Sequence, residues 1–150
     1  MELDEIAAVL EGADFFSICN DEQKRFLAFA SEPVALSAGD ILFSTGDMAD
    51  GAYILMSGTL TSTDETGASP YVHEVDEPGA VVGEMGLILP RARRSTVTAK
   101  DDVDLLFVPA TAFGKLMRQF PDLAARAARR IQSELEAYLK AVERFKTASE

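Results

Sequence analysis

Short apolar runs separated by glycine-containing turns are the feature that most restricts how this chain can fold. Between Pro33 and Pro109 such runs recur about every 8–12 residues, a spacing typical of β-sandwiches and barrels. Glycine beside aspartate or proline, as in Gly39-Asp40 and Pro78-Gly79, permits tight turns at little backbone strain. The expected strands cover residues 34–36, 41–44, 52–56, 60–63, 71–75, 80–82, 95–99 and 103–108. Eight short strands in this arrangement predict a double-sheet β jelly roll.

Helical patterns flank the expected strands on both sides. Near the N-terminus, apolar residues recur at helical spacing at Leu3, Ile6, Ala7 and Leu10. Asn20 or Asp21 can cap a second helix, and Pro121 can open a long helix that runs to about residue 146. We therefore expect a mainly β fold with flanking helices in one domain over residues 1–150. Its parts are N-terminal helices at about 2–31, a β-roll at about 33–109 and C-terminal helices at about 111–146.

The long C-terminal helix carries a heptad pattern. Its apolar residues follow alternating steps of four and three, at Ala124, Ala128, Ile131, Leu135, Tyr138, Val142 and Phe145. About three heptads is near the lower limit for a coiled coil. The pattern fits an amphipathic helix that packs on its own β-roll, and it equally fits a parallel helix pair in a homodimer.

Charge is divided unevenly along the chain, although the formal net charge is −11. Residues 1–90 hold 17 Asp and Glu against Lys24 and Arg25, whereas residues 91–150 hold 12 Lys and Arg against 8 Asp and Glu. The sign changes at an arginine cluster over residues 91–94. The acidic total disfavours general binding to DNA or to membranes. The change of sign fits either two solvated faces of different composition or an anion site at the arginines.

Several classes of function lack the residues that they need. Cys19 and His73 are the only residues of their types, which excludes an internal disulfide and the clustered histidines of metal-dependent enzymes on β-rolls. No set of nucleophile, base and orienting group can be assembled, so we expect no enzyme activity, no metal and no cofactor. Cys19 is expected to pack as a small hydrophobe. His73 could contact a ligand, but a surface or packing role is favoured. The acidic N-terminus and the short apolar runs predict a cytoplasmic chain without a membrane span.

One segment combines features that suit a phosphate and a sugar. The expected strand at 80–82 ends in Gly83, about one helical turn follows, and the arginine cluster comes next. Backbone N–H groups at a helix start and the planar guanidinium fork both match phosphate oxygens. Glu84 repels a phosphate, but it can accept hydrogen bonds from sugar hydroxyls. This combination indicates a sugar phosphate or a nucleotide as ligand.

The same segment resembles the phosphate-binding cassette of cyclic nucleotide-binding domains, such as those of the catabolite activator protein and the protein kinase A regulatory subunit. The resemblance rests on Gly83-Glu84-Met85-Gly86-Leu87, on the spacing from Glu84 to Arg93, and on Ser95-Thr96-Val97-Thr98-Ala99. The stretches 36–47 and 52–58 are similar to the family's first strands, so the resemblance covers roughly residues 15–145. It implies an eight-stranded jelly roll with a short cassette helix and a long C-terminal helix.

The resemblance also implies which residues bind the ligand. Glu84 is expected to accept hydrogen bonds from the ribose 2′-hydroxyl, Arg93 to pair with the cyclic phosphate, and Val82 to line the apolar wall. Further contacts, mostly through backbone N–H groups, are expected from Gly83, Met85, Gly86, Arg94 and Ser95. The competing interpretation is structural, with an ion pair between Glu84 and Arg93 and with glycines that serve turn geometry alone.

Arg94 departs from the family pattern, which usually has a small residue at this position. Its side chain could point to solvent, add a second charge to the phosphate or crowd it. The arginine–small pair could also be Arg94-Ser95, one residue out of register, but Arg93 keeps the usual spacing to Glu84 and Val97. In this family a small hydroxyl residue directly after the arginine commonly recognises guanine. Here only Ser95 could take over that role. The choice between cAMP and cGMP therefore stays open, with a lean to cAMP.

Two functions are consistent with these residues. We favour a non-enzymatic sensor or regulatory domain that binds cAMP or cGMP. The alternative is a degenerate domain that serves as a protein-interaction or dimerisation module without ligand, and Arg94 is the residue that keeps this alternative open. The expected partners are a cyclic nucleotide and, through the C-terminal helix, a second copy of the chain. Transcription regulators of the family add a helix-turn-helix after this helix, and no such DNA-binding domain is expected in this chain.

Overall fold

The computed structural model describes the backbone of residues 1–65 and 67–149, and the side chains of these residues except 138, 142 and 145–149. Within this part of the chain, the strands are Glu32–Leu36 (β1), Ile41–Phe43 (β2), Gly51–Ser57 (β3), Leu60–Asp64 (β4), Tyr71–Val75 (β5), Val81–Val82 (β6), Thr96–Ala99 (β7) and Val103–Pro109 (β8). Every strand that the sequence predicts is present. The strand ends differ from the predicted ends by one or two residues at most.

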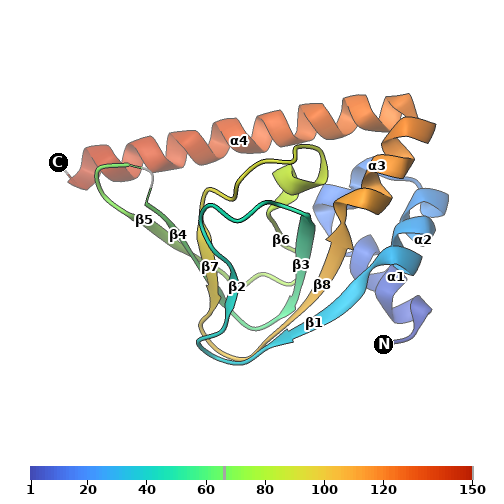
Figure 1. Ribbon diagram of the computed structural model, residues 1–150, viewed down its shortest axis with the longest axis horizontal. Coiled ribbons are helices and arrows are strands. Elements are labelled where there is room, and N and C mark those ends of the chain that lie inside the picture. The colour runs from blue at the N-terminus through green and yellow to red at the C-terminus, as the bar shows by residue number, and fades with distance from the viewer. Residues whose placement is uncertain (66, 150) are drawn as a thin grey trace.

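The strands form two antiparallel sheets that face each other (Figure 1). One sheet has the order β1-β8-β3-β6 and the other has the order β2-β7-β4-β5. Neighbours in each sheet are mostly distant in sequence, as expected for a jelly roll. The predicted fold class is therefore confirmed.

Two turns with the same sequence pattern, Ser-x-Gly-Asp, hold the two ends of β2. In residues 37–40 the Asp40 N–H donates to the Ser37 carbonyl at 2.9 Å, and the Asp40 carboxylate accepts from the Ser37 N–H at 2.8 Å. Residues 44–47 repeat both hydrogen bonds at 3.0 and 2.9 Å. The glycines have φ angles of +92° and +94°, a conformation that glycine adopts without strain. The second turn lies beside the arginine cluster, because the Gly46 N–H donates to the Arg93 carbonyl at 2.9 Å.

Helices precede and follow the sheets, and a short one interrupts them. The helices are Leu3–Glu11 (α1), Asp14–Ile18 (η1), Asp21–Ala30 (α2), Glu84–Leu87 (η2), Ala110–Gln119 (α3) and Pro121–Ser149 (α4). Asn20 caps α2 in a capping box with Gln23, so Asn20 rather than Asp21 is the N-cap. The long helix begins at Pro121, as predicted.

The hydrophobic core has two parts that share the central strands. Leu105 of β8 packs between the two sheets, in a cluster with Phe43 and Leu60. The next residue, Leu106, packs on the opposite face of its sheet, in a cluster with helical residues such as Phe16. Because side chains alternate along a strand, adjacent apolar residues show that this sheet is buried on both faces. Cys19 lies in the second cluster, as predicted, and burial raises the pKa of its thiol to about 11.

Helix α4 crosses the whole roll and contacts η1, α3 and β5 (Figure 1). Its buried stripe is Leu123, Ala127 and Ile131, which are at most 5% exposed. The predicted heptad seam shares only Ile131 with this stripe, since Ala124 is half-buried and Ala128 is exposed. The seam residues Tyr138, Val142 and Phe145 lie outside the described side chains. In the part of the chain that the structure describes, no helix is long and apolar enough to cross a membrane.

Candidate ligand site

The site begins where β6 ends and the chain turns sharply at Gly83. Gly83 has a φ angle of +76°, in the left-handed region that favours glycine. Its carbonyl accepts a hydrogen bond from the Gly86 N–H at 2.9 Å, which closes the first turn of η2. The turn brings Glu84 and Met85 beneath α4 and directs η2 back toward β3.

Arg93 is buried beneath this turn, although arginine is charged and is rarely buried in proteins. Its guanidinium donates to the Gly51 carbonyl at 2.9 Å and to the Gly83 carbonyl at 3.3 Å. It lies 4.2 Å from the centre of the Phe43 ring and 3.6 Å from the carboxylate of Asp50. Burial lowers the pKa of Arg93, but arginine remains charged at neutral pH. A fixed, buried cation of this kind is suited to an anionic ligand.

Gly83 and Gly86 make the room that Arg93 occupies. A methyl group on Gly83 would collide with the guanidinium nitrogen Nη1, and one on Gly86 would crowd the same nitrogen at 3.1 Å. At Gly86 it would also lie 2.7 Å from the Gly51 carbonyl oxygen. The two glycines therefore do more than form a turn, because they allow an arginine from the following loop to pass beneath it.

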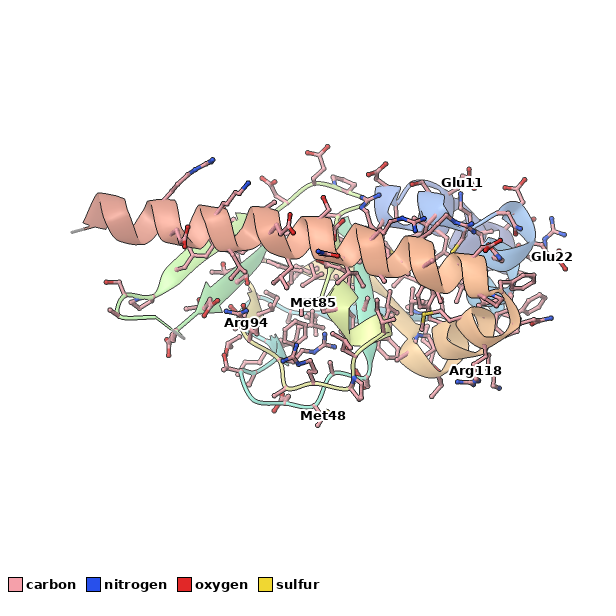
Figure 2. All side chains as sticks on the ribbon, turned by 90° about the horizontal axis from the view of Figure 1, so that it is seen from above. Glu11, Glu22, Met48, Met85, Arg94 and Arg118 are labelled. Carbon is pink, nitrogen blue, oxygen red and sulfur yellow. The ribbon has the colours of Figure 1, made fainter. Side chains whose placement is uncertain are left out.

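The eight residues that the sequence singles out line one cavity of about 230 Å³. They are Val82, Gly83, Glu84, Met85, Gly86, Arg93, Arg94 and Ser95. Figure 2 shows the labelled Met85 and Arg94 beside α4, which crosses the roll. Arg93 is buried, whereas Arg94 is exposed at the edge of the cavity. The cavity is slightly smaller than the roughly 300–1,000 Å³ typical of small-molecule pockets.

Glu84 does not form the ion pair with Arg93 that the structural interpretation expects. Its carboxyl group is hydrogen-bonded to the carboxyl group of Glu134 on α4, and Arg93 pairs with Asp50. Burial, followed by the hydrogen bond to Glu134, raises the pKa of Glu84 to about 8. Glu84 is therefore mostly protonated at neutral pH.

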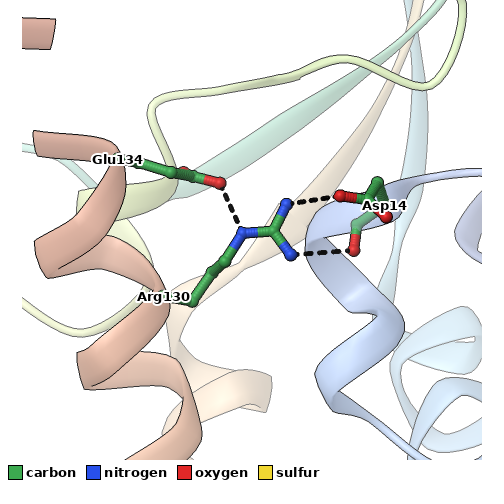
Figure 3. Close-up of polar contacts among 3 residues, drawn as sticks. All are labelled: Asp14, Arg130 and Glu134. Atoms are coloured by element: carbon green, nitrogen blue, oxygen red, sulfur yellow. Dashed lines mark hydrogen bonds and ion pairs between the residues drawn. The ribbon is translucent and has the colours of Figure 1, made fainter. Parts of the chain in front are cut away.

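Glu134 is held in turn by Arg130, one helical turn earlier on α4 (Figure 3). Arg130 Nε donates to the Glu134 carboxylate at 2.7 Å. The other end of the guanidinium donates to Asp14 of η1, to its carboxylate at 2.7 Å and to its carbonyl at 3.3 Å. The chain of contacts thus connects the candidate site to the N-terminal helices.

Sequence reasoning missed several residues of this cavity. Ser62, His73, Glu134 and Leu135 also line it. His73, for which the sequence favours a surface or packing role over a ligand contact, lines the cavity with its ring 5.2 Å from that of Tyr71, and burial lowers the pKa of the imidazole. The spacing of Arg130 and Glu134 signals a helical ion pair, but nothing in the sequence places that pair at the site. Among the described residues, no group of three or more His, Cys, Asp or Glu is arranged to hold a metal ion.

Two four-stranded sheets, a glycine turn that covers a buried arginine, and a long helix across the cavity define a β-roll with flanking helices. The family profile of the cyclic nucleotide-binding domain matches residues 33–120. The chain belongs to this family.

Solved structures with this fold include several bacterial proteins. A cyclic nucleotide-binding-like protein from Brucella abortus is 31% identical, with a TM-score of 0.64, and the match covers 76% of this chain and 98% of that one. The N-terminal domain of a transcriptional regulator from Streptomyces coelicolor is 26% identical, with a TM-score of 0.69, over 89% of this chain and 94% of that domain. The regulatory domain of Toxoplasma gondii PKA, crystallised with cAMP, shares the fold at 21% identity and a TM-score of 0.69, over 85% of this chain and 49% of that one.

Curated relatives are much longer proteins. The lysophospholipase nte1 of Neurospora crassa is 26% identical over 112 residues, which are 74% of this chain and 7% of that protein. The patatin-like phospholipase domain-containing protein 7 of Rattus norvegicus is 31% identical over 104 residues, which are 68% of this chain and 8% of that protein. The chain thus spans less than a tenth of the length of these relatives.

Proposed function

We propose that this chain binds a cyclic purine nucleotide, cAMP in preference to cGMP, and acts as a non-enzymatic regulatory domain. The observation that carries the proposal is the buried guanidinium of Arg93 at the wall of a cavity that the carboxyl group of Glu84 also lines. A buried cation attracts one small anion at contact distance even in an acidic protein, because exposed charges beyond about 8 Å are largely screened at physiological salt.

Each proposed contact has a defined chemical role. Arg93 pairs with the cyclic phosphate, and backbone N–H groups around Gly83 to Gly86 surround its other oxygens. Glu84 accepts from the ribose 2′-hydroxyl, and Val82 contacts the apolar face of the ligand. Arg94, exposed at the edge of the cavity, adds positive charge without filling the space. The relatives that are cyclic nucleotide-binding by name support the same ligand class.

Isothermal titration with cAMP and cGMP tests the proposal. The wild-type protein should bind cAMP, and Arg93→Ala should weaken binding by about 2–5 kcal/mol because a buried phosphate loses its charged partner. Arg129→Ala, on an exposed position of α4, is a matched control that should bind as the wild type does. The proposal fails if folded protein shows no heat with either nucleotide at millimolar concentration.

The non-enzymatic role and the homodimer are tested by separate measurements. Unchanged recovery of cAMP after incubation with the protein would agree with a non-enzymatic, regulatory role. Sedimentation with and without nucleotide tests the homodimer through α4. A ligand-independent dimer that takes up no nucleotide would instead favour the interaction-module alternative. We also propose a cytoplasmic location, which fluorescence microscopy of the tagged chain checks.

A further inference from the structure

Glu134 of α4 contacts the carboxyl group of Glu84, the group proposed to accept a hydrogen bond from the ribose 2′-hydroxyl. Glu84 and Glu134 line the same cavity, and their carboxyl groups are hydrogen-bonded to each other. A carboxylate has no donor, so two carboxyl groups form a hydrogen bond only if one of them carries a proton. The two carboxyl groups therefore share one proton inside the candidate site.

The neighbours of the pair indicate which group carries this proton. Glu134 already accepts a hydrogen bond from a charged donor, Arg130 Nε, at 2.7 Å. Burial is the main reason that the pKa of Glu84 rises to about 8. At neutral pH Glu84 thus donates its proton to Glu134 and offers a weaker acceptor than a carboxylate does to any other group.

We propose that Glu134 competes with the nucleotide for Glu84, so that a ribose hydroxyl gains a carboxylate acceptor only after the shared proton leaves for solvent and Glu134 moves aside. The inference rests on the proposed function, because it concerns the same ligand and the same site. It adds Glu134 to the residues that set affinity, and it links ligand binding to proton release.

Other charged and titratable groups around the pair come from four segments. Arg130 lies on α4, and Asp14 lies on η1 behind it. Arg93 acts on Glu84 from beneath the glycine turn, and Arg91 and Arg94 line the cavity from the same loop. His73 faces the cavity from β5, but burial lowers the pKa of its imidazole, which is therefore neutral at pH 7 and above. Between pH 7 and 9, Glu84 is the group in this set whose shifted pKa falls within the range.

Loss of the shared proton leaves two carboxylates at contact distance, which repel each other. Glu134 can then stay with Arg130 while α4 shifts, or it can rotate away from the cavity. Glu84 and Glu134 also line a second hollow, shared with Asp14 and Arg130, so separation of the pair would join the two spaces. Ligand binding would in this way change how α4 lies on η1.

Titration calorimetry with cAMP at pH 7 and pH 9 tests the competition. In the wild type, the fraction of ionised Glu84 rises about tenfold between these pH values, so affinity should rise about tenfold. At pH 7, experiments in buffers of different ionisation enthalpy should show release of about 0.9 proton per cAMP. In Glu134→Gln, the amide can donate to the Glu84 carboxylate, so both effects should become smaller, although burial of Glu84 keeps part of them. Glu136→Gln, exposed two residues further along α4, should behave as the wild type does.

Whether Glu84 and Glu134 share a proton can also be tested in the protein without ligand. In ¹³C NMR of the carboxyl groups, Glu84 should titrate near pH 8 in the wild type and at a lower pH in Glu134→Gln. The inference is overturned if cAMP binds with equal affinity and no proton release at both pH values, or if Glu84 titrates alike in the two proteins. Absence of nucleotide binding by every variant at pH 7 and pH 9 would instead overturn the proposed function and, with it, the competition.

Discussion

Gly83 shows most clearly how single residues build the candidate site. Its positive φ angle bends the chain into η2, and its missing side chain leaves room for the guanidinium of Arg93. Gly39 has a similar φ angle, but a methyl group there would meet nothing within 4 Å. The two positions therefore separate the cost of backbone strain from the cost of displacing the arginine.

Replacement of these glycines by alanine should have partly different effects. Gly39→Ala should lower the free energy of unfolding by about 1–2 kcal/mol, the cost of a left-handed conformation with a Cβ atom, and Gly83→Ala should lower it further because the buried arginine is displaced. Only Gly83→Ala should also abolish cAMP binding, because its methyl group pushes Arg93 out of place. Urea denaturation and calorimetry measure the two effects. Full cAMP affinity in Gly83→Ala would contradict this role of the glycine.

The glycine turn and Arg93 could be predicted because their signal is local in sequence. Glu134 could not, since it reaches the site from another element and its place depends on how α4 packs. His73 shows the same limit, because alternation on β5 does not tell which face borders a cavity and which borders the core.

At the scale of elements, the strands were predictable from turn chemistry and the orientation of α4 was not. Both Ser-x-Gly-Asp turns end a strand where the sequence places an end. On α4, apolar side chains occupy more than one face, so Leu123 and Ala127 compete with Ala124 and Ala128 for the core. Packing against α3 and η1 decides between them, and this contact is absent from any local pattern.

The capping box of α2 gives a prediction at this scale. Asn20→Ala should lower the free energy of unfolding by about 1 kcal/mol, because the Gln23 N–H loses its acceptor at 2.8 Å. Gln132→Ala, an exposed amide in the middle of α4, is the control and should change stability by less than about 0.5 kcal/mol. Chemical denaturation of both variants provides the comparison. Equal stability of the two would show that the cap contributes nothing.

For the whole molecule, the raised pKa of Glu84 predicts how stability depends on pH. The folded protein holds this proton up to about pH 8, whereas the ordinary glutamate value of 4.5 applies to the unfolded chain. The contribution is therefore complete below about pH 4.5 and is lost as the pH rises through 8. Relative to Glu84→Gln, the wild type should become steadily less stable from pH 5 to pH 8 and then level off.

Urea denaturation of both proteins at each pH measures this difference. Taking the difference removes the effect of the other titrating groups, which the two proteins share. Glu22→Gln, at an exposed position of α2, is the control for removal of one acidic side chain outside the site. A constant difference between Glu84→Gln and the wild type would contradict a buried, protonated Glu84.

Leu105 and Leu106 are neighbours in β8 but pack in different halves of the core, and this arrangement affects how the protein unfolds. Neither half can lose its packing while β8 stays in place, so the helical layer and the β-roll unfold together. Backbone amides in β3 and β8 should then exchange with deuterium only through complete unfolding. A ligand bound in the cavity would slow amide exchange in β3 and β8 as much as at the residues that it contacts. Slower exchange at amides far from the cavity would therefore also indicate that the ligand is bound.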